Sequence, residues 1–293
     1  MKKIIAIIVF LATASCAVAQ EKKEYKKVVY PEGYTSQLDV VYTKVGDWDG
    51  RMDLYLPSKD KGPSPAIINI HGGGWNHGEK ESQGGFNTFF KMGYAVANIE
   101  YRLTPQATAP AAVEDTRCAL IYLIKNAKAL NIDVNKIVIM GGSAGGHLAL
   151  MGGLLANNPI FDTNCPGAKE VKVAAIVDKY GITDVWDWGY GKDITSKSAT
   201  RWLGDKASDA DFARSVSPIN WVTKNSPPIF IAHGDADPIV PYQQSVELHK
   251  KLVKLGVKNE FISVPGGKHG GFTVEQNRDL NLKIAAFLKG LGI

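Results

Sequence analysis

The chain has 293 residues, of which 45% are hydrophobic and 22% are charged. These proportions are those of a folded globular domain, and they exclude a disordered or collagen-like chain. The formal net charge is only +5, and the basic run at residues 22–27 has no recognition motif around it, so we expect no nucleic-acid partner.

The first twenty residues have the layout of a secretory signal peptide. Two lysines precede an apolar run at residues 4–12, and small residues follow it. Ala17 and Ala19 occupy the two positions that signal peptidase must accept, so we predict a signal peptide over residues 1–19 and a secreted or periplasmic protein. Lipidation at Cys16 and an uncleaved anchor are the alternatives, although the apolar run is much shorter than the roughly 20 residues that span a bilayer.

Apolar runs separated by turn signals predict alternating strands and helices after this segment. Two runs alternate apolar and polar residues, as half-buried strands do, and six later runs are almost wholly apolar, as in strands buried on both faces. The predicted strands are residues 37–44, 51–56, 66–70, 94–99, 136–140, 173–177, 229–232 and 261–264, and the predicted helices are 110–130, 143–156, 242–255 and 276–288. This order predicts one α/β domain over residues 20–293, with a mostly parallel central sheet and helices on both faces.

Two features interrupt the regular pattern. Residues 182–218 are irregular and rich in aromatic side chains, and a connection of this length indicates an insertion with a function or a small subdomain. Cys118 and Cys165 remain after the predicted cleavage and either form a disulfide in an oxidising compartment or stay as separate thiols. Neither cysteine has metal-binding spacing, so we expect no metal site.

The most specific motif is GGSAGGH at residues 141–147. It contains the pattern G-x-S-x-G between a predicted strand and a predicted helix, which is the context of a nucleophile elbow. The glycines allow the strand and the helix to approach closely, and Ser143 is the predicted nucleophile. The alternative is a glycine-rich turn in which Ser143 only caps the helix.

A second glycine-rich loop, HGGGW at residues 71–75, follows another predicted buried strand. Its glycines leave backbone N–H groups accessible, and such donors stabilise a developing oxyanion. We predict that the amides of Gly73, Gly74 and Ala144 form this oxyanion hole. His71 is expected to be structural, and Trp75 to line the site or to pack beside the loop.

A serine nucleophile requires a base, and the base requires an orienting carboxylate. His269 is the predicted base because glycines flank it in a loop after the last predicted strand. Asp237 is the predicted carboxylate, and Asp235 is expected to brace the loop. Structural or surface positions are expected for His77, His147, His233 and His249. The chain order Ser143, Asp237, His269 is that of the α/β-hydrolases.

Together, HGGGW, GGSAGGH, the acid loop HGDADPIVP (233–241), the His269 loop and EYRL (100–103) resemble the α/β-hydrolase esterase/lipase family. The resemblance covers about residue 44 to the C-terminus. It is strongest to bacterial bifunctional acetyl-xylan and feruloyl esterases, with hormone-sensitive-lipase-like carboxylesterases as near relatives. It implies an α/β-hydrolase fold and no cofactor. It also implies a serine carboxylesterase that acts on short acyl or aryl esters of plant-polysaccharide carbohydrates. The substrate would be a small molecule or an oligosaccharide.

The resemblance makes Trp75, Trp186 and Trp188 candidates for substrate binding, although the rings of the insertion could equally form its own core. Two other functions stay open. A serine peptidase of the prolyl-oligopeptidase type shares the fold and the order of the triad, but it usually carries a large additional domain. A non-catalytic homologue that binds a glycan or a partner would be expected to have lost part of the Ser-Asp-His set.

Overall fold

The computed structural model of this chain describes residues 25–165, 167–168 and 170–293. The predicted signal peptide and Cys16 lie outside the described residues, so export and lipidation stay predictions. Within the described part, no helix has both the length and the apolar character that crossing a membrane requires.

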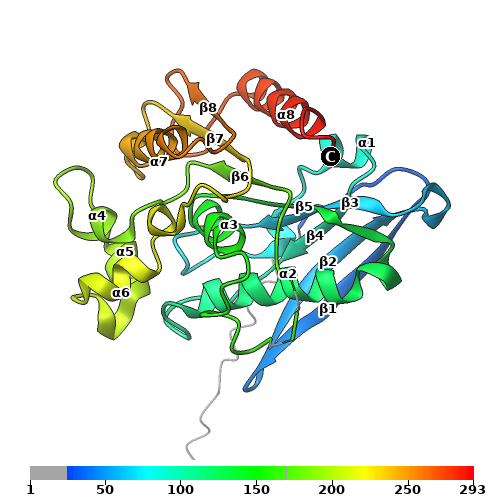
Figure 1. The fold of residues 1–293 in the computed structure, drawn as a ribbon, viewed down its shortest axis with the longest axis horizontal. Coiled ribbons are helices and arrows are strands. Elements are labelled where there is room, and N and C mark those ends of the chain that lie inside the picture. The colour runs from blue at the N-terminus through cyan, green and yellow to red at the C-terminus, as the bar shows by residue number, and fades with distance from the viewer. Residues whose placement is uncertain (1–24, 166, 169) are drawn as a thin grey trace, which may run out of the picture.

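A single eight-stranded sheet forms the centre of the molecule (Figure 1). Its order is β1-β2-β4-β3-β5-β6-β7-β8, with antiparallel pairing of β1, β2 and β4 and parallel pairing from β4 to β8. The bounds are β1 Tyr34–Val45, β2 Trp48–Pro57, β3 Ser64–Ile70, β4 Ala95–Ile99, β5 Ile132–Gly142, β6 Ala175–Lys179, β7 Ile229–Gly234 and β8 Asn259–Val264. The predicted fold class, with its antiparallel start, is confirmed.

Helices cover both faces of this sheet. Their bounds are α1 Asn87–Lys91, α2 Ala111–Leu130, α3 Ala144–Leu154, α4 Val185–Tyr190, α5 Lys197–Leu203, α6 Ala210–Ser215, α7 Tyr242–Lys254 and α8 Val274–Lys289. Figure 1 shows α1 and α8 on one side of the sheet and α2 and α3 on the other. Short 3-10 turns are found at Lys59–Lys61, Lys80–Ser82, Gly204–Lys206 and Pro218–Trp221.

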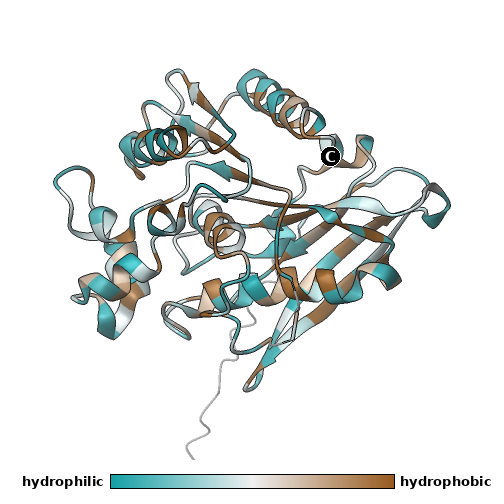
Figure 2. Ribbon diagram, in the orientation of Figure 1, coloured by the Kyte–Doolittle hydropathy of each residue, from teal (hydrophilic) through white to brown (hydrophobic). Residues whose placement is uncertain are grey.

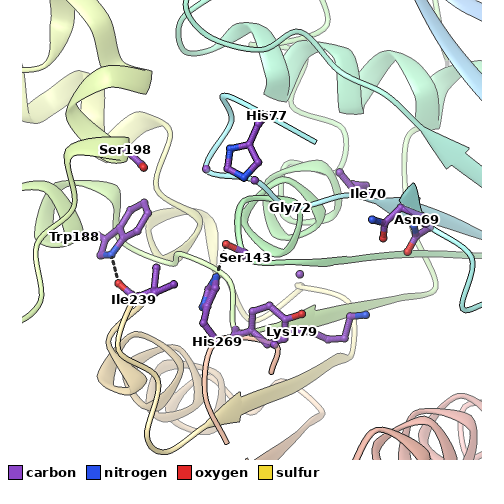
Figure 3. A pocket seen from close by; sticks show the side chains of 16 residues that line it. Asn69, Ile70, Gly72, His77, Ser143, Lys179, Trp188, Ser198, Ile239 and His269 are labelled. Atoms are coloured by element: carbon purple, nitrogen blue, oxygen red, sulfur yellow. Dashed lines mark hydrogen bonds between the residues drawn. The ribbon is translucent and has the colours of Figure 1, made fainter. Parts of the chain in front are cut away.

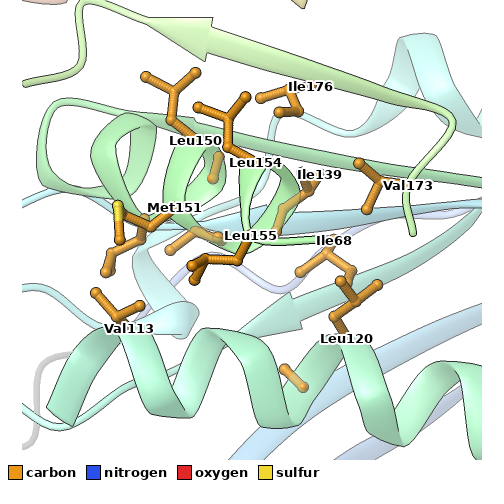
Figure 4. Close-up of a cluster of buried hydrophobic side chains, with 14 of the residues drawn as sticks. Ile68, Val113, Leu120, Ile139, Leu150, Met151, Leu154, Leu155, Val173 and Ile176 are labelled. Atoms are coloured by element: carbon orange, nitrogen blue, oxygen red, sulfur yellow. The ribbon is translucent and has the colours of Figure 1, made fainter. Parts of the chain in front are cut away.

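The two faces hold separate apolar cores because successive residues of a strand point to opposite sides. Ile68 of β3 packs with Ile139, Leu120 and Leu150 in the core beneath α2 and α3 (Figure 4). Its neighbour Ile67 belongs to the core beneath α1 and α8. Each fully buried side chain of this size contributes about 1.5–3 kcal/mol of hydrophobic free energy. Figure 2 shows the corresponding pattern, with hydrophobic residues along the central strands and mixed hydropathy on α7 and α8.

The insertion is helical, which corrects the prediction that residues 182–218 are irregular. Helices α4, α5 and α6 lie together beyond one end of the sheet, at the left of Figure 1. Trp202, Ala213 and Val216 are buried within it. Helices of six or seven residues are too short to show a 3.6-residue period in the sequence, which explains the error.

Cys118 and Cys165 form a disulfide, which settles the alternative that the sequence left open. Their Cα atoms are 5.3 Å apart, within the range that a disulfide requires. The bond joins α2 to the segment that follows α3.

Candidate active site

Ser143 stands at a sharp turn between β5 and α3. Its backbone has φ 58° and ψ −125°, a conformation that non-glycine residues rarely adopt and that is found mainly at functional sites. Its N–H donates to the carbonyl of Lys179 at 2.9 Å. A Cβ on Gly145 would overlap the carbonyl oxygen of Ile70, and a Cβ on Gly141 would overlap that of Gly145. The turn therefore needs both glycines of the motif.

The structure brings His269 and Asp237 to Ser143, as the sequence analysis expected. His269 Nε2 is 2.8 Å from Ser143 Oγ (Figure 3). His269 Nδ1 is 2.7 Å from Asp237 Oδ2. A carboxylate only accepts hydrogen bonds, so Nδ1 carries the proton and Nε2 is left to accept from the serine hydroxyl. This is the arrangement that general-base activation of a serine requires.

The surroundings of Asp237 keep its carboxylate ionised. Burial raises its pKa, but hydrogen bonds from His233, His269 and the Ile239 amide outweigh burial and hold the pKa well below its usual range. Asp237 Oδ1 also accepts the Val240 N–H at 3.1 Å. The side chain has no exposed surface, so its charge acts on His269 with little screening by water.

Two neighbouring residues support this carboxylate and the histidine loop. His233, which is fully buried, lies 3.1 Å from Asp237 Oδ2 through Nε2 and 2.7 Å from Ser245 Oγ through Nδ1. Asp235 accepts the N–H of Gly266 at 2.7 Å, which braces the loop that carries His269. The sequence placed His233 beside the acid but did not show that it contacts it.

The HGGGW loop lies against the nucleophile. Gly73 and Gly74 line the same cavity as Ser143, and both have positive φ, 117° and 55°. A Cβ on Gly73 would overlap the carbonyl oxygen of His77. Ala144 follows Ser143 directly as the first residue of α3, where helix N–H groups lack partners within the helix. The predicted oxyanion donors are thus grouped around the predicted nucleophile.

His71 has a structural environment. It is 2% exposed and stacks on Tyr101 with ring centroids 4.3 Å apart. Burial lowers the pKa of His71 to about 4, so the ring is neutral at physiological pH. The Tyr101 hydroxyl, which belongs to the EYRL segment, donates to the carbonyl of His71 at 3.1 Å. These contacts fix the start of the glycine loop.

Only one of the three predicted substrate-binding tryptophans lines the cavity. Trp188 does so, and its Nε1 donates to the Ile239 carbonyl at 3.0 Å. Trp75 is instead fully buried and stacks on Trp202 at 4.2 Å, so a substrate cannot reach its ring. Trp186 is outside the set of lining residues and pairs with Tyr190 at 4.5 Å. The prediction that Trp75 and Trp186 bind the substrate is therefore wrong.

Most histidines outside the predicted triad occupy the structural or surface positions that the sequence predicts. His147 is fully buried, and burial lowers its pKa to about 4. Its Nε2 is 2.8 Å from the Val216 carbonyl. His249 on α7 is 2.6 Å from Asn259 Oδ1. His77 differs, because it lines the cavity.

Tyr180 is a site residue that sequence reasoning missed. Its ring meets His269 edge-on with centroids 5.0 Å apart, and it lines the cavity. Burial, with smaller contributions from Asp237 and Asp178, raises its pKa to about 12, so the phenol keeps its proton. Gly142 and Gly270 leave room for its hydroxyl end. The available signal was its position after a buried strand, at the end of a parallel sheet where ligands bind.

The cavity at this site has a volume of about 450 Å³, within the usual range for a small-molecule site. Its floor is formed by the ends of β3, β5 and β6, and one side by the helical insertion. Lining residues are Asn69, Ile70, Gly72, Gly73, Gly74, His77, Gln83, Gly142, Ser143, Lys179, Tyr180, Trp188, Ser198, Ile239, His269 and Gly270.

A serine at a strand-turn-helix elbow, a histidine after the last strand and an acid after the preceding strand define an α/β-hydrolase. The sheet and the covering helices agree with that class. More narrowly, the chain belongs to the BD-FAE family, whose model matches residues 52–252. The resemblance inferred from the motifs is thereby confirmed.

Solved structures and curated proteins support the same assignment. The chain is 30% identical to a truncated form of a carbohydrate esterase from gut microbiota, with a TM-score of 0.74 over 90% of this chain and 100% of that one. It is 25% identical to an acetyl ester-xyloside bifunctional hydrolase from Caldicellulosiruptor lactoaceticus, with a TM-score of 0.73 over 84% and 90% of the two chains.

Esterase LipC of Mycobacterium tuberculosis is 29% identical over 257 residues, which are 84% of this chain and 59% of that protein. Two further mycobacterial relatives, Esterase LipQ and the probable carboxylic ester hydrolase LipM, are each matched over 50% of their length. The chain thus spans about half to three-fifths of the length of these curated relatives.

Proposed function

We propose that this protein is a secreted serine carboxylesterase that hydrolyses short acyl or aryl esters, with esters of plant-polysaccharide carbohydrates as its substrates. The observation that carries the proposal is the continuous hydrogen-bonded series Ser143, His269, Asp237 at a cavity bordered by Gly73 and Gly74. Family membership and the carbohydrate esterase among its structural neighbours support it.

The proposed reaction is a two-step acyl transfer. Ser143 Oγ attacks the ester carbonyl while His269 Nε2 accepts the hydroxyl proton. Asp237 stabilises the imidazolium that forms and keeps His269 in the required tautomer. The amides of Gly73, Gly74 and Ala144 donate to the oxyanion of the tetrahedral intermediate.

His269 then returns the proton to the departing alcohol oxygen, and the C–O bond of the ester breaks. Water, deprotonated by the same His269, attacks the acyl-serine. His269 then returns this proton to Ser143 Oγ as the bond between the acyl carbon and Oγ breaks, and the acid is released. The second step restores Ser143 and closes the cycle. The 2.8 Å distance between Ser143 Oγ and His269 Nε2 supports the proton transfer between these two groups.

The size of the substrate is inferred from the cavity, and export of the protein is inferred with support from the disulfide. The cavity is bounded by Trp188, which is held against the Ile239 carbonyl, and its volume suits a short acyl or an aryl group better than a long chain. Export agrees with the disulfide between Cys118 and Cys165, because such bonds form in oxidising compartments.

The first experiment is acetate release from acetylated xylo-oligosaccharides, with 4-nitrophenyl acetate as a general ester substrate and Ser143→Ala as the matched variant. We expect wild-type turnover of both, and a loss of at least about ten-thousandfold in Ser143→Ala, as for other triad deletions. Activity of the variant would contradict the assignment of the nucleophile.

Other outcomes are also informative. Turnover of the nitrophenyl ester alone would keep the mechanism and exclude acetyl-xylan as the substrate, and methyl ferulate and other small aryl esters would then be assayed. No turnover of any ester by a folded wild-type protein would contradict the esterase proposal and favour a peptidase or a non-catalytic protein.

A further inference from the structure

Ser143 separates two chemically different sides of the cavity. Figure 3 shows Trp188, Ser198 and Ile239 on one side of it and Asn69 and Lys179 on the other. We call the side formed by Asn69 and Lys179 the polar arm. The mechanism proposed above uses neither of its side chains.

Lys179 is fixed at the site by the sheet. It is the last residue of β6 and pairs in register with Gly142 of β5, so the two backbones are about 4.8 Å apart. Its carbonyl accepts the N–H of Ser143. The backbone of Lys179 thus holds the nucleophile, while its side chain lines the cavity.

The ammonium group of Lys179 has no counter-charge in the described part of the chain. No hydrogen bond or ion pair joins its Nζ to another described group, and none of the described residues that line the cavity carries a carboxylate side chain. Burial lowers the pKa of Lys179. Lys179 is half-buried, and an ammonium that has lost part of its water without gaining a partner is costly. Such costs are concentrated at functional sites.

Lys80 shows how this fold satisfies a buried lysine elsewhere. Its Nζ forms ion pairs with Asp39 and Asp53 at 2.9 Å, and with Glu81. Three carboxylates therefore surround Lys80, whereas none is available to Lys179 among the described residues that share its cavity. The difference leaves the Lys179 ammonium available to an anion that is not part of the described residues.

Asn69 provides a second donor on the same side of Ser143 as Lys179 (Figure 3). Its Nδ2 donates to Asn98 Oδ1 at 3.0 Å, and Asn98 Nδ2 donates to the Lys80 carbonyl at 2.7 Å. This series fixes the orientation of the Asn69 amide, which keeps one further N–H. The polar arm therefore offers an ammonium and an oriented amide donor, a set suited to carboxylate oxygens.

We propose that the polar arm binds a carboxylate group of the substrate, with Lys179 as the residue that determines this specificity. The inference rests on the proposed esterase function. The carboxylate has two chemical sources: the acyl part, as in a half-ester of a dicarboxylic acid, or the alcohol part, as in an acetylated oligosaccharide that carries a uronate.

Two matched substrate pairs test the proposal and distinguish the sources. The acyl pair is 4-nitrophenyl hemisuccinate and 4-nitrophenyl 4-methylpentanoate, which has a similar branched end without charge. The alcohol pair is acetylated xylo-oligosaccharide with and without a glucuronate substituent. The quantity compared is the ratio of kcat/KM for the charged member to that for its neutral partner.

Lys179→Met removes the charge and keeps the length of the side chain. We expect it to lower this ratio at least tenfold for one pair, which identifies the source. Turnover of 4-nitrophenyl acetate is measured beside it, so that a general loss of activity is separated from a loss of specificity. Lys179→Arg should retain the ratio of wild type. Lys268→Met is the matched control, because Lys268 is an exposed neighbour of His269 outside the cavity lining, and it should leave both ratios unchanged.

The proposal is overturned if Lys179→Met leaves both ratios unchanged, or if it lowers turnover of charged and neutral esters equally. Lys179→Gln replaces the methionine variant in the same comparison if that variant does not fold. Failure of wild type on 4-nitrophenyl acetate would instead contradict the esterase function itself, so the two failures are distinguishable.

Discussion

Ser143 and Trp188 line the same cavity, but different kinds of contact hold them there. Ser143 is positioned by a local motif, in which Gly141 and Gly145 permit a strained turn at the end of β5. Trp188 is positioned by long-range packing, through its hydrogen bond to Ile239 and its edge-on contact with Trp75. Short sequence motifs therefore predict the Ser-His-Asp cluster. The side of the cavity formed by Trp188 depends instead on contacts between residues that are distant in the sequence.

The largest expected effect is a loss of activity that distinguishes Asp237 from Asp235, two aspartates of one loop. Asp237→Asn should lower kcat by about 10³–10⁴, because an amide does not hold His269 in the required tautomer or stabilise its positive charge. Asp235→Asn should cost less than about tenfold, since it affects one hydrogen bond to an exposed loop. Steady-state kinetics with 4-nitrophenyl acetate would measure both, and equal losses would contradict the assignment of the acid.

Packing of the insertion is tested by two of its tryptophans. Trp202→Ala should lower the free energy of unfolding by about 3–5 kcal/mol, the cost of a large cavity in a core, because its ring is 1% exposed and stacks on Trp75. Trp186→Ala should cost about 1 kcal/mol, as is typical of a partly exposed position. Urea unfolding would compare them. Similar values for the two variants would contradict the assignment of Trp202 to a packed core.

The elbow is tested by adding a single methyl group. Gly145→Ala should destabilise the protein by about 1–3 kcal/mol, as overpacking does, and should reduce activity, because the new Cβ would overlap the Ile70 carbonyl and displace α3. Gly84→Ala is the matched control, since no atom lies within 4 Å of its Cβ position. An active, stable Gly145→Ala variant would show that the close approach of β3 and α3 is dispensable.

A buried carboxyl group behind the elbow should make the stability of the protein depend on pH. Burial raises the pKa of Asp178 to about 7, so the folded protein keeps a proton there that the unfolded chain loses near pH 4. Stability should therefore fall as pH rises from about 4 to 7. Asp178→Asn should remove this dependence, gaining on the order of 2–3 kcal/mol relative to wild type between pH 5 and 8. Parallel pH slopes in urea unfolding would contradict the prediction.

Most of the sheet was predictable because its strands are short, apolar and separated by turn residues. The predicted strand at 66–70 became β3 (Ser64–Ile70), and the predicted helix at 110–130 became α2 (Ala111–Leu130). Helices α4 to α6 were missed, since six or seven residues do not establish a helical period. Trp75 was misplaced because its burial depends on Trp202, which lies far along the chain.

The sequence by itself determined the fold class and the chemical types of the predicted triad, because strand periodicity and the G-x-S-x-G turn are local consequences of side-chain size and backbone freedom. Only the tertiary structure decided which side chains share the cavity. Tyr180, Lys179 and Asn69 line it together because parallel strands end at one edge of the sheet. Such contacts depend on distances in space that no spacing in the sequence encodes.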